Sequence, residues 1–503
     1  MSDFPIVIVG TGFSGIAMGV ALKKAGIDSF TILEKAADIG GTWRDNTYPG
    51  AACDVPSHLY CFSFEPKPDW SRFFSPQQEI HAYLRHCVTK YDLARHIQFE
   101  SKVTGAEFDT TSGTWTVRIE GREPMRARAV VLGNGALHVP SYPDIPGREE
   151  FAGKLFHSAK WDHDYDLSGK TVAVIGTGAS SIQFVPEIAP KVEQLHLFQR
   201  TPPWIVPKPD RVMGRREHTL YRRFRPIHWL LRALIYWIME ARALGFVISP
   251  RLMKLFERQA IRFLETSVPD PALRAKLRPS YAIGCKRILI SNDYYPALRR
   301  PNVGLVTDGI ERITRTGVRT RDGVERPVDA IICGTGFMVA DYVNTLNIVG
   351  RGGRTLSASV QAKEGHHLGT AVRGFPNLFL MMGPNTGLGH NSMVFMIEAQ
   401  ARYALQAIQA IRRRKLRFLD VREPVQRAFT ERVQAKLRGS VWNSGCRSWY
   451  VGEDGYNLTV WPFFTFQYWW QTRRLALSEY EMVPEAATEP RQLARPVPAP
   501  SMA

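Results

Sequence analysis

Two glycine-rich turns, each directly after an apolar run, are the residues with the clearest chemical potential. The first, IVIVGTGFSG, places Gly10, Gly12 and Gly15 after the apolar run 6–9. Glycine at these positions allows a tight turn, lets a pyrophosphate approach the backbone, and lets the following helix pack closely. Glu34 lies 24 residues after Gly10, where a carboxylate can accept hydrogen bonds from a ribose. The unit predicts a dinucleotide site.

The second turn, TVAVIGTGASS, repeats this design with Gly176, Gly178 and Ser181. Serine at the third position predicts a somewhat less close approach of the helix. Counting 24 residues from Gly176 leads to Arg200, a cation where the first unit has an acid. A cation suits the 2′-phosphate of NADPH, and Thr201 can add a hydroxyl contact. We therefore expect FAD at the first turn and NADPH at the second.

Two dinucleotides in one chain imply that a hydride passes from nicotinamide to flavin, as in a disulfide reductase, a dehydrogenase or a monooxygenase. The chain has six cysteines: Cys53, Cys61, Cys87, Cys285, Cys333 and Cys446. They show no CxxC or metal-ligand spacing, so we expect reduced thiols, no redox pair and no bound metal. The disulfide reductase is therefore the weakest of the three.

Length and composition are those of a globular protein with two or three domains. The chain has 503 residues, of which 44% are apolar and 22% charged. The start, MSDFPIVIVG, lacks the basic and apolar regions of a secretion signal. We expect a cytoplasmic protein.

The formal charge of +18 comes mostly from one region, because residues 200–300 contain 21 Lys and Arg against 7 Asp and Glu. This region includes the apolar stretch 228–250, which charges interrupt too often for a membrane span. We interpret it as a buried or substrate-lining helix; a basic helix on an anionic membrane surface is the alternative. A basic nucleic-acid-binding protein on a flavin fold is a remote alternative, and no nucleic acid is expected.

Two longer segments resemble the signatures of the type I Baeyer–Villiger monooxygenases. GGTWRDNTYPGAACD matches the longer signature at Gly41, Trp43, Tyr48, Pro49, Gly50 and Asp54. FAGKLFHSAKWD matches the shorter signature at Phe151, Gly153, His157, Trp161 and Asp162. Related N- and S-oxygenating flavin monooxygenases usually carry tyrosine and a basic residue at the last two of these positions. The resemblance extends to about Ser478.

The resemblance implies an FAD domain that is split in the sequence around an NADPH domain, which itself carries a helical insertion. Each of the two dinucleotide-binding domains is expected to be a doubly wound, Rossmann-like α/β unit. The expected boundaries are 1–140 and 371–480 for the FAD domain, 141–210 and 286–370 for the NADPH domain, and 211–285 for the insertion. Residues 481–503 are rich in proline and alanine and are expected to be disordered.

The resemblance also implies a reaction in which NADPH reduces FAD, O₂ forms a C4a-peroxyflavin, and this species converts a ketone to an ester or lactone. Arg287 matches the catalytic arginine, and Asp54 matches its orienting acid and flavin neighbour. Lys286 matches the second contact to the 2′-phosphate. Gly41 and Trp43 belong to the FAD-binding signature. N- or S-oxygenation by the same kind of flavin is the alternative reaction.

Further expectations concern the junction and the C-terminal third. In the resembling family the histidine matching His157 belongs to the moving junction between the cofactor domains, with Trp161 packed beside it. Asn385, His390 and Asn391 are candidates for flavin contact. The C-terminal tryptophans and tyrosines are expected in the core or at an interface, and some line a channel for a small apolar ketone: Trp442, Trp449, Tyr450, Trp461, Trp469 and Trp470.

Overall fold

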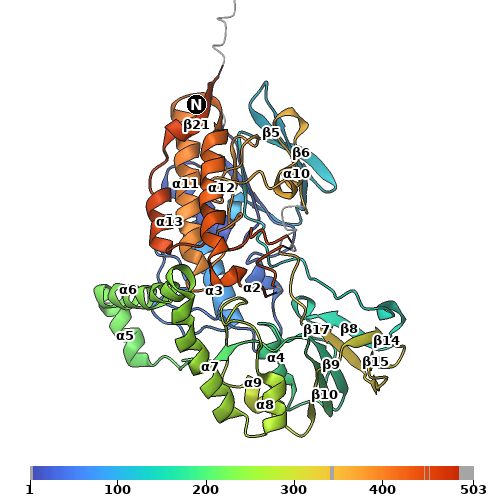
Figure 1. Ribbon diagram of the computed structural model, residues 1–503. Helices are drawn as coiled ribbons and strands as arrows, with labels where there is room; N and C mark the ends of the chain where they lie inside the picture. Colours follow the sequence, from blue (N-terminus) through green and yellow to red (C-terminus); the bar gives the residue numbers. More distant parts are fainter. Residues whose placement is uncertain (1–3, 340–344, 447, 453, 486–503) are drawn as a thin grey trace, which may run out of the picture.

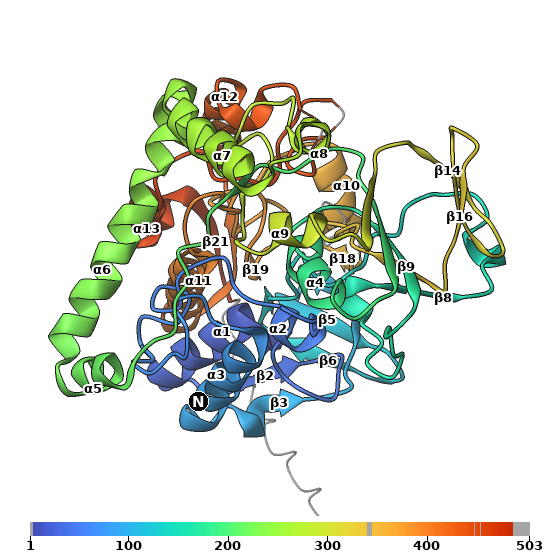
Figure 2. The ribbon, with the colours of Figure 1, turned by 90° about the horizontal axis from the view of Figure 1, so that it is seen from below.

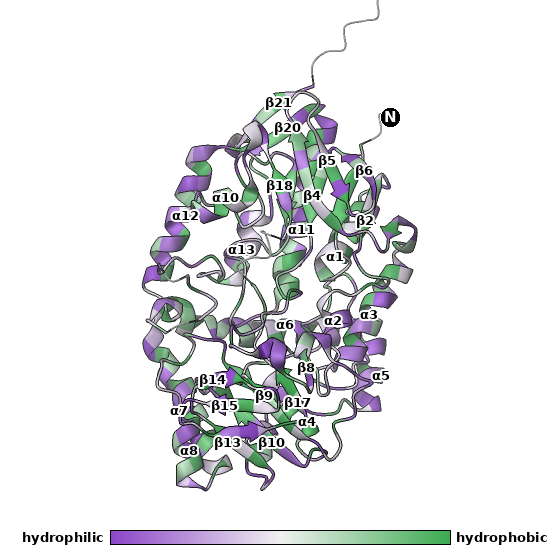
Figure 3. Cartoon of the chain, turned by 90° about the vertical axis from the view of Figure 1, so that its right-hand side faces the viewer, coloured by the Kyte–Doolittle hydropathy of each residue, from purple (hydrophilic) through white to green (hydrophobic). Residues whose placement is uncertain are grey.

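The structure is a computed structural model that describes residues 4–339, 345–446, 448–452 and 454–485. Figure 1 shows two α/β units. One lies around the helices α11 (Met393–Arg413) and α12 (Glu423–Arg438), and the other around the strands β8 (Lys154–His157), β9 (Thr171–Ile175) and β10 (Gln194–Phe198). The interior strands of both units carry most of the hydrophobic colour in Figure 3. This arrangement confirms the predicted fold of two dinucleotide-binding units.

The strands are β1 (Ile6–Val9), β2 (Phe30–Leu33), β3 (Ile97–Gln98), β4 (Val103–Asp109), β5 (Thr114–Ile119), β6 (Arg122–Ala127), β7 (Ala129–Leu132), β8 (Lys154–His157), β9 (Thr171–Ile175), β10 (Gln194–Phe198), β11 (Ile205–Val206), β12 (Leu289–Ile290), β13 (Val303–Val306), β14 (Ile310–Ile313), β15 (Gly317–Thr320), β16 (Glu325–Pro327), β17 (Ala330–Cys333), β18 (Asn347–Val349), β19 (Leu378–Leu380), β20 (Leu416–Val421) and β21 (Tyr480–Pro484). The helices are α1 (Phe13–Lys24), α2 (Thr42–Asp45), α3 (Gln77–Lys90), α4 (Ser181–Ile188), α5 (Arg215–Arg223), α6 (Arg225–Ala241), α7 (Met253–Ser267), α8 (Pro271–Leu277), α9 (Tyr294–Leu298), α10 (Leu356–Gln361), α11 (Met393–Arg413), α12 (Glu423–Arg438) and α13 (Thr465–Thr472).

The two parallel sheets follow the same plan. The first has the order β19-β7-β1-β2-β3 and the second β13-β10-β9-β17-β8. In both, the strand before the glycine turn lies at the centre: β1 pairs with β2 and β7, and β9 pairs with β10 and β17. Every residue of β1 is buried, as expected for a parallel strand covered on both faces.

The chain returns to the first unit earlier than predicted. β18 pairs with β4 in the four-stranded sheet β18-β4-β5-β6, which belongs to the first unit. Leu346 and Ile348 are buried in the same core cluster as strand β4. The predicted boundary at residue 371 therefore lies too late, because a three-residue strand leaves no readable periodicity in the sequence.

The C-terminal boundary also moves. Residues 480–484 form β21, which pairs antiparallel with β20, and Tyr480 is buried with its hydroxyl 2.8 Å from that of Tyr403. The prediction of disorder from residue 481 is therefore wrong for residues 481–485, and its remainder lies outside the described residues.

The predicted insertion 211–285 contains the helices α5, α6, α7 and α8. Figure 2 shows α6 running along one edge of the molecule. The prediction that the stretch 228–250 is a buried helix is wrong for the outward side of α6, where Leu230 is 70% exposed. No helix among the described residues is long and apolar enough to cross a membrane.

Candidate functional site

The first glycine turn joins β1 to α1 with almost no spare space. Gly10 has φ +95°, and a Cβ atom on it would lie 2.8 Å from the carbonyl oxygen of Gly133. A Cβ atom on Gly15 would lie 1.9 Å from the carbonyl oxygen of Gly10, so only glycine allows α1 to begin here. Gly12 faces the backbone of Gly41, whose Cβ would lie 3.2 Å from the Cα of Gly12. Two bare backbones therefore form a cradle that fits a pyrophosphate.

Glu34 follows β2 directly and is buried beside this turn. Its carboxylate accepts hydrogen bonds from the amide of Thr11 at 3.0 Å and from its hydroxyl at 2.5 Å. Arg44 forms an ion pair with Glu34 at 2.9 Å. The predicted acid thus lies at the turn, and its neighbours Thr11 and Arg44 were not identified from the sequence.

The segment 41–54 connects the flavin turn to the second unit. The indole of Trp43 donates to the Tyr60 hydroxyl at 3.1 Å. The Tyr48 hydroxyl donates to the side-chain carbonyl of Gln183 on α4 at 2.9 Å. A Cβ atom on Gly50 would lie 2.7 Å from the backbone oxygen of Gln183. This signature segment therefore packs directly against the first helix of the second unit.

Asp54 and Arg287, 233 residues apart in the sequence, form a two-point contact. The Nε atom of Arg287 lies 2.9 Å and a terminal nitrogen 2.6 Å from the same oxygen of Asp54. About a third of each side chain is accessible, 34% for Arg287 and 31% for Asp54. The charge of Asp54 raises the pKa of Arg287 against the opposing effect of burial. The arginine is therefore a permanent, oriented cation.

Tyr450 is a further residue at this pair that the sequence did not single out for chemistry. Its side chain is buried, and burial raises the pKa of its phenol, while the charge of Arg287 lowers it. Nothing in the local pattern relates a tyrosine at 450 to an arginine at 287. The phenolic oxygen of Tyr450 can accept a hydrogen bond from Arg287 and so help to hold the guanidinium in one orientation.

A disulfide between Cys285 and Cys446 corrects the prediction that all six cysteines are reduced. The two residues are 161 positions apart, so no local spacing reveals the pair. The bond links the segment that carries Lys286 and Arg287 to the loop that precedes Tyr450. The other cysteines are free and buried, as expected for inert thiols: Cys53, Cys61, Cys87 and Cys333.

The second glycine turn repeats the geometry of the first with one exchange. Gly176 has φ +105°, and its Cβ would lie 2.5 Å from the carbonyl oxygen of Gly334. Around Gly178 the nearest atom to a Cβ is 3.9 Å away, which leaves room for a phosphate. A Cβ on Gly334 would lie 2.0 Å from the hydroxyl of Ser181. Ser181 therefore fits because the residue opposite it, Gly334, has no side chain.

Arg200 and Lys286 lie close together beside the second turn. Burial and then the charge of Arg200 lower the pKa of Lys286. The Lys286 ammonium lies 4.7 Å from the ring centre of Tyr281. Neither cation has a carboxylate partner in an ion pair among the described residues. Thr201 adjoins them, with its carbonyl accepting from Thr177 at 3.3 Å. Two cations without a carboxylate partner have the chemistry that suits a phosphate.

His157 is the last residue of β8 and is fully buried, beside the two chain segments that connect the units. Its Nδ1 accepts from the amide of Ala159 at 3.1 Å. Its ring lies 5.4 Å from that of Tyr142 and 5.8 Å from that of Phe337, on the two segments that connect the units. Burial lowers the pKa of His157 to about 4. The side chain is thus a neutral ring between the two crossing segments.

The other residues of the shorter signature surround β8. Trp161 packs against Phe184 of α4 with ring centres 5.3 Å apart. Asp162 forms an ion pair with Lys154 at 2.6 Å. A Cβ on Gly153 would lie 2.6 Å from the ring of Phe151, so this glycine allows the aromatic ring to fold over the backbone. None of these residues contacts Arg287 or Asp54 in the geometry described.

His157 leads to a prediction about acid stability. An unfolded histidine has a pKa of about 6.5. Between pH 6.5 and 4 the unfolded chain therefore binds a proton that His157 in the native protein does not bind. The free energy of unfolding therefore falls as the pH decreases through this range. The free energy of unfolding, measured with urea, should fall from pH 7.5 to pH 5 by about 2 kcal/mol less in His157→Asn than in the wild type. The exposed His163→Asn is the control, and equal losses in all three proteins would contradict the prediction.

Asn385 is held inside the C-terminal part of the first unit. Its side chain bonds to the His366 ring at 2.9 Å and to the carbonyls of Asn457 at 2.8 Å and Val460 at 3.2 Å. With these bonds made, the side chain has little capacity left for the flavin contact that the sequence suggested. Among the C-terminal aromatic residues, Trp442, Tyr450 and Trp461 are buried, whereas Trp449, Trp469 and Trp470 are exposed.

Two parallel dinucleotide-binding sheets, joined through a signature segment, place the protein in the class of pyridine-nucleotide-dependent flavoproteins. Residues 4–246 match the model of the flavin-binding monooxygenase-like family. The chain is 49% identical over 500 residues to a Baeyer–Villiger monooxygenase of Pseudomonas aeruginosa, covering 98% of this chain and 95% of the relative. It is 44% identical to a Baeyer–Villiger monooxygenase of Streptomyces coelicolor, covering 96% and 93%.

Solved structures of monooxygenases have the same fold as this chain. An oxidised steroid monooxygenase bound to NADP has a TM-score of 0.87 at 29% identity, covering 96% of this chain and all of that one. A closed crystal structure of cyclohexanone monooxygenase has a TM-score of 0.84 at 26% identity, covering 96% and 99%. The chain belongs to the Baeyer–Villiger monooxygenase family. It is an FAD- and NADPH-dependent monooxygenase that uses O₂ to convert ketones to esters or lactones.

Proposed function

We propose that the protein oxidises a small apolar ketone at a site beside Arg287 and Asp54, with FAD on the turn after β1 and NADPH on the turn after β9. The observation that carries this assignment is the two-point contact of Arg287 with Asp54, at 2.9 and 2.6 Å. This contact joins the chain just after the helical insertion to the end of the segment 41–54. Bound FAD supplies the redox chemistry with NADPH and O₂.

Arg287 has two tasks in this proposal. Oxygen transfer to a ketone develops negative charge on oxygen, and a fixed cation with rigid donors stabilises that charge without prior reorganisation. Asp54 keeps the guanidinium charged and oriented. Its carboxylate occupies one edge of the fork, and the terminal nitrogen outside this contact can donate to the reacting oxygen.

The test is product analysis of the FAD-loaded protein with NADPH and O₂ on linear, cyclic and steroid ketones, together with a set of sulfides. We expect esters or lactones from the ketones. Sulfoxides alone, with no ester from any ketone, would instead indicate heteroatom oxygenation. Sulfoxides together with esters remain consistent with the proposal.

The cation pair leads to a prediction about cofactor choice. Arg200→Ala and Lys286→Ala should each raise the KM for NADPH about 10- to 100-fold, because each removes a charged hydrogen bond to the 2′-phosphate. The KM for NADH should change little, since NADH lacks that phosphate. Steady-state oxidation of both cofactors measures the ratio, with the exposed Lys191→Ala as control. An unchanged preference for NADPH over NADH in both variants would show that neither cation binds the 2′-phosphate.

His157 is proposed to couple NADPH binding to movement between the units, because its ring touches both crossing segments. His157→Ala should slow turnover about tenfold or more through one half-reaction, with FAD content retained. Stopped-flow rates of reduction and of reoxidation, measured separately, reveal which one. If both rates and overall turnover match wild type, the residue has no part in the movement.

A cytoplasmic location is proposed as well, supported by the dependence on NADPH. The Cys285–Cys446 disulfide is unusual for this location, because thiols in a cytosol are kept reduced.

A further inference from the structure

Helix α6 presents three polar side chains, His228, Arg232 and Glu240, to the protein interior, together with the apolar Ile235 and Met239. Arg232 is buried and donates to the carbonyls of His58 at 2.7 Å and Cys61 at 3.1 Å. The rings of His228 and His58 are bonded at 2.9 Å. Glu240 is buried and accepts from Asn391 and Thr465, at 2.6 and 2.7 Å from their side chains. The inward polar groups are thus satisfied by protein partners.

The outward side of α6 is apolar, whereas the outward side of a usual surface helix is polar. Leu230 is 70% exposed and Trp237 is 57% exposed. Leu234 and Ile238 lie on the same side at helical spacing and are also exposed. More than half of the large exposed apolar side chains in the described chain fall within residues 220–255.

The apolar surface continues onto α13. The ring of Trp237 lies 6.1 Å from that of Phe466, at the start of α13. Trp470 on the same helix is 66% exposed. We call this surface the α6–α13 face: Leu230, Leu234, Trp237, Ile238, Phe466 and Trp470. A contiguous exposed surface of this kind marks a site of interaction with another apolar phase or partner.

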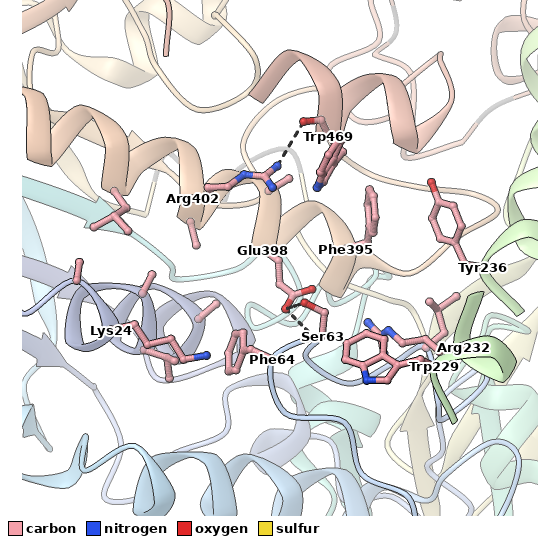
Figure 4. Close-up of a pocket in the computed structure, with 18 of the residues that line it drawn as sticks. Lys24, Ser63, Phe64, Trp229, Arg232, Tyr236, Phe395, Glu398, Arg402 and Trp469 are labelled. Atoms are coloured by element: carbon pink, nitrogen blue, oxygen red, sulfur yellow. Dashed lines mark hydrogen bonds between the residues drawn. The ribbon is translucent and has the colours of Figure 1, made fainter. Parts of the chain in front are cut away.

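A cavity of about 720 Å³ opens beside the α6–α13 face (Figure 4). Trp229 of α6 and Trp469 of α13 line it and are also partly exposed, so the cavity and the face form one apolar region. Most of its lining is aliphatic or aromatic, with four charged side chains: Lys24, Arg232, Glu398 and Arg402. Neither Arg287 nor Asp54 lines it, so it is separate from the proposed reaction site.

The surroundings of the face are strongly basic. Residues 215–262 contain 11 Lys and Arg against 3 Asp and Glu, and one of these acids, Glu240, is buried. On α5 and at the start of α6, four exposed arginines have no carboxylate partner in an ion pair among the residues described: Arg215, Arg216, Arg223 and Arg225. Arg473 covers the Trp470 ring at 4.5 Å.

We propose that the α6–α13 face docks the protein onto an anionic phospholipid bilayer. Leucine and tryptophan side chains would enter the boundary between headgroups and acyl chains, while the arginines would contact anionic headgroups. Two copies of this chain would bring their arginines together and repel each other, whereas anionic lipid complements them. The helix lies on the bilayer, since its 17 residues are interrupted by charges and its polar side is fixed to the protein.

The test is flotation of the FAD-loaded full chain with vesicles of phosphatidylcholine alone or with 30% phosphatidylglycerol. We expect binding to the anionic vesicles that falls at least tenfold as NaCl is raised from 0.05 to 0.5 M, and little binding to phosphatidylcholine. Leu230→Gln/Leu234→Gln/Trp237→Gln should lower binding at least tenfold and keep its FAD and its activity on a dissolved ketone. Val324→Gln, an exposed apolar residue of the second unit, is the matched control.

Charge is tested separately. Arg223→Gln and Arg225→Gln should each weaken vesicle binding about fivefold, with Arg321→Gln unchanged. Three results would overturn the proposal: no flotation at low salt, equal flotation of the triple variant, or a wild-type dimer in sedimentation velocity that the triple variant dissociates. In the last case a second copy would cover the face.

Discussion

Replacing Arg287 with alanine is expected to abolish oxygen transfer to ketones while leaving reduction of FAD by NADPH nearly unchanged. Reduction requires the two cofactors to meet and needs no cation at the reacting ketone. Oxygen transfer requires stabilised negative charge, and Arg287 is the cation that Asp54 orients at this position. Loss of one such stabilising group costs on the order of 10² to 10³ in rate, and loss of a full charge costs at least that.

The measurement compares stopped-flow reduction of FAD with ester yield in the same variant. Arg287→Lys keeps a charge without the rigid fork and should retain a small part of the ester yield. Arg299→Ala, an exposed arginine nearby in the sequence, controls for total charge. FAD content and thermal midpoint show whether each variant is folded. A variant that fails only in reduction, with normal ester yield once chemically reduced, would refute the assigned role.

Replacing Gly15 with alanine is expected to prevent FAD binding. The new methyl group would lie 1.9 Å from the carbonyl oxygen of Gly10, and neither atom can move without displacing the turn or the start of α1. Overpacking against backbone distorts the structure more than overpacking against a side chain does. The FAD-to-protein ratio of the purified variant should fall at least about tenfold, with all activity lost.

Gly19 on the same helix provides a matched control. A Cβ atom there would contact only the ends of the Ile32 and Leu93 side chains, at 3.2 and 3.3 Å. Gly19→Ala should therefore retain most of its FAD and a native circular dichroism spectrum. If Gly15→Ala binds FAD as well as Gly19→Ala does, the close approach at this turn does not control the flavin site.

Local patterns in the sequence predict both cofactor turns. Gly10 and Gly176 require positive φ, and the buried strands before them have continuous apolar runs. The hydrophobic pattern and the turn residues therefore predict the same strand and turn. Asp54 and Arg287 could be paired only through a resemblance to a family, because no spacing rule relates positions 233 apart. The structure then shows the contact directly.

Other features depend on tertiary partners that a pattern cannot show. Ser181 is compatible with the second turn because Gly334, directly after β17, has no side chain where the serine hydroxyl lies. The Cys285–Cys446 bond joins two distant loops. The apolar residues of α6 predict a buried helix, whereas many of them face outward and the buried positions include Arg232 and Glu240, whose partners lie on other elements.

The central claim is that this chain inserts one oxygen atom from O₂ into a ketone at the expense of NADPH. The most direct measurement mixes the FAD-loaded protein with NADPH, a ketone and ¹⁸O₂, and determines ester, isotope content and NADPH consumed. We expect one ¹⁸O atom per ester and one NADPH per ester. NADPH consumption with unchanged ketone and hydrogen peroxide as the sole oxygen product, for every ketone tried, would contradict the account.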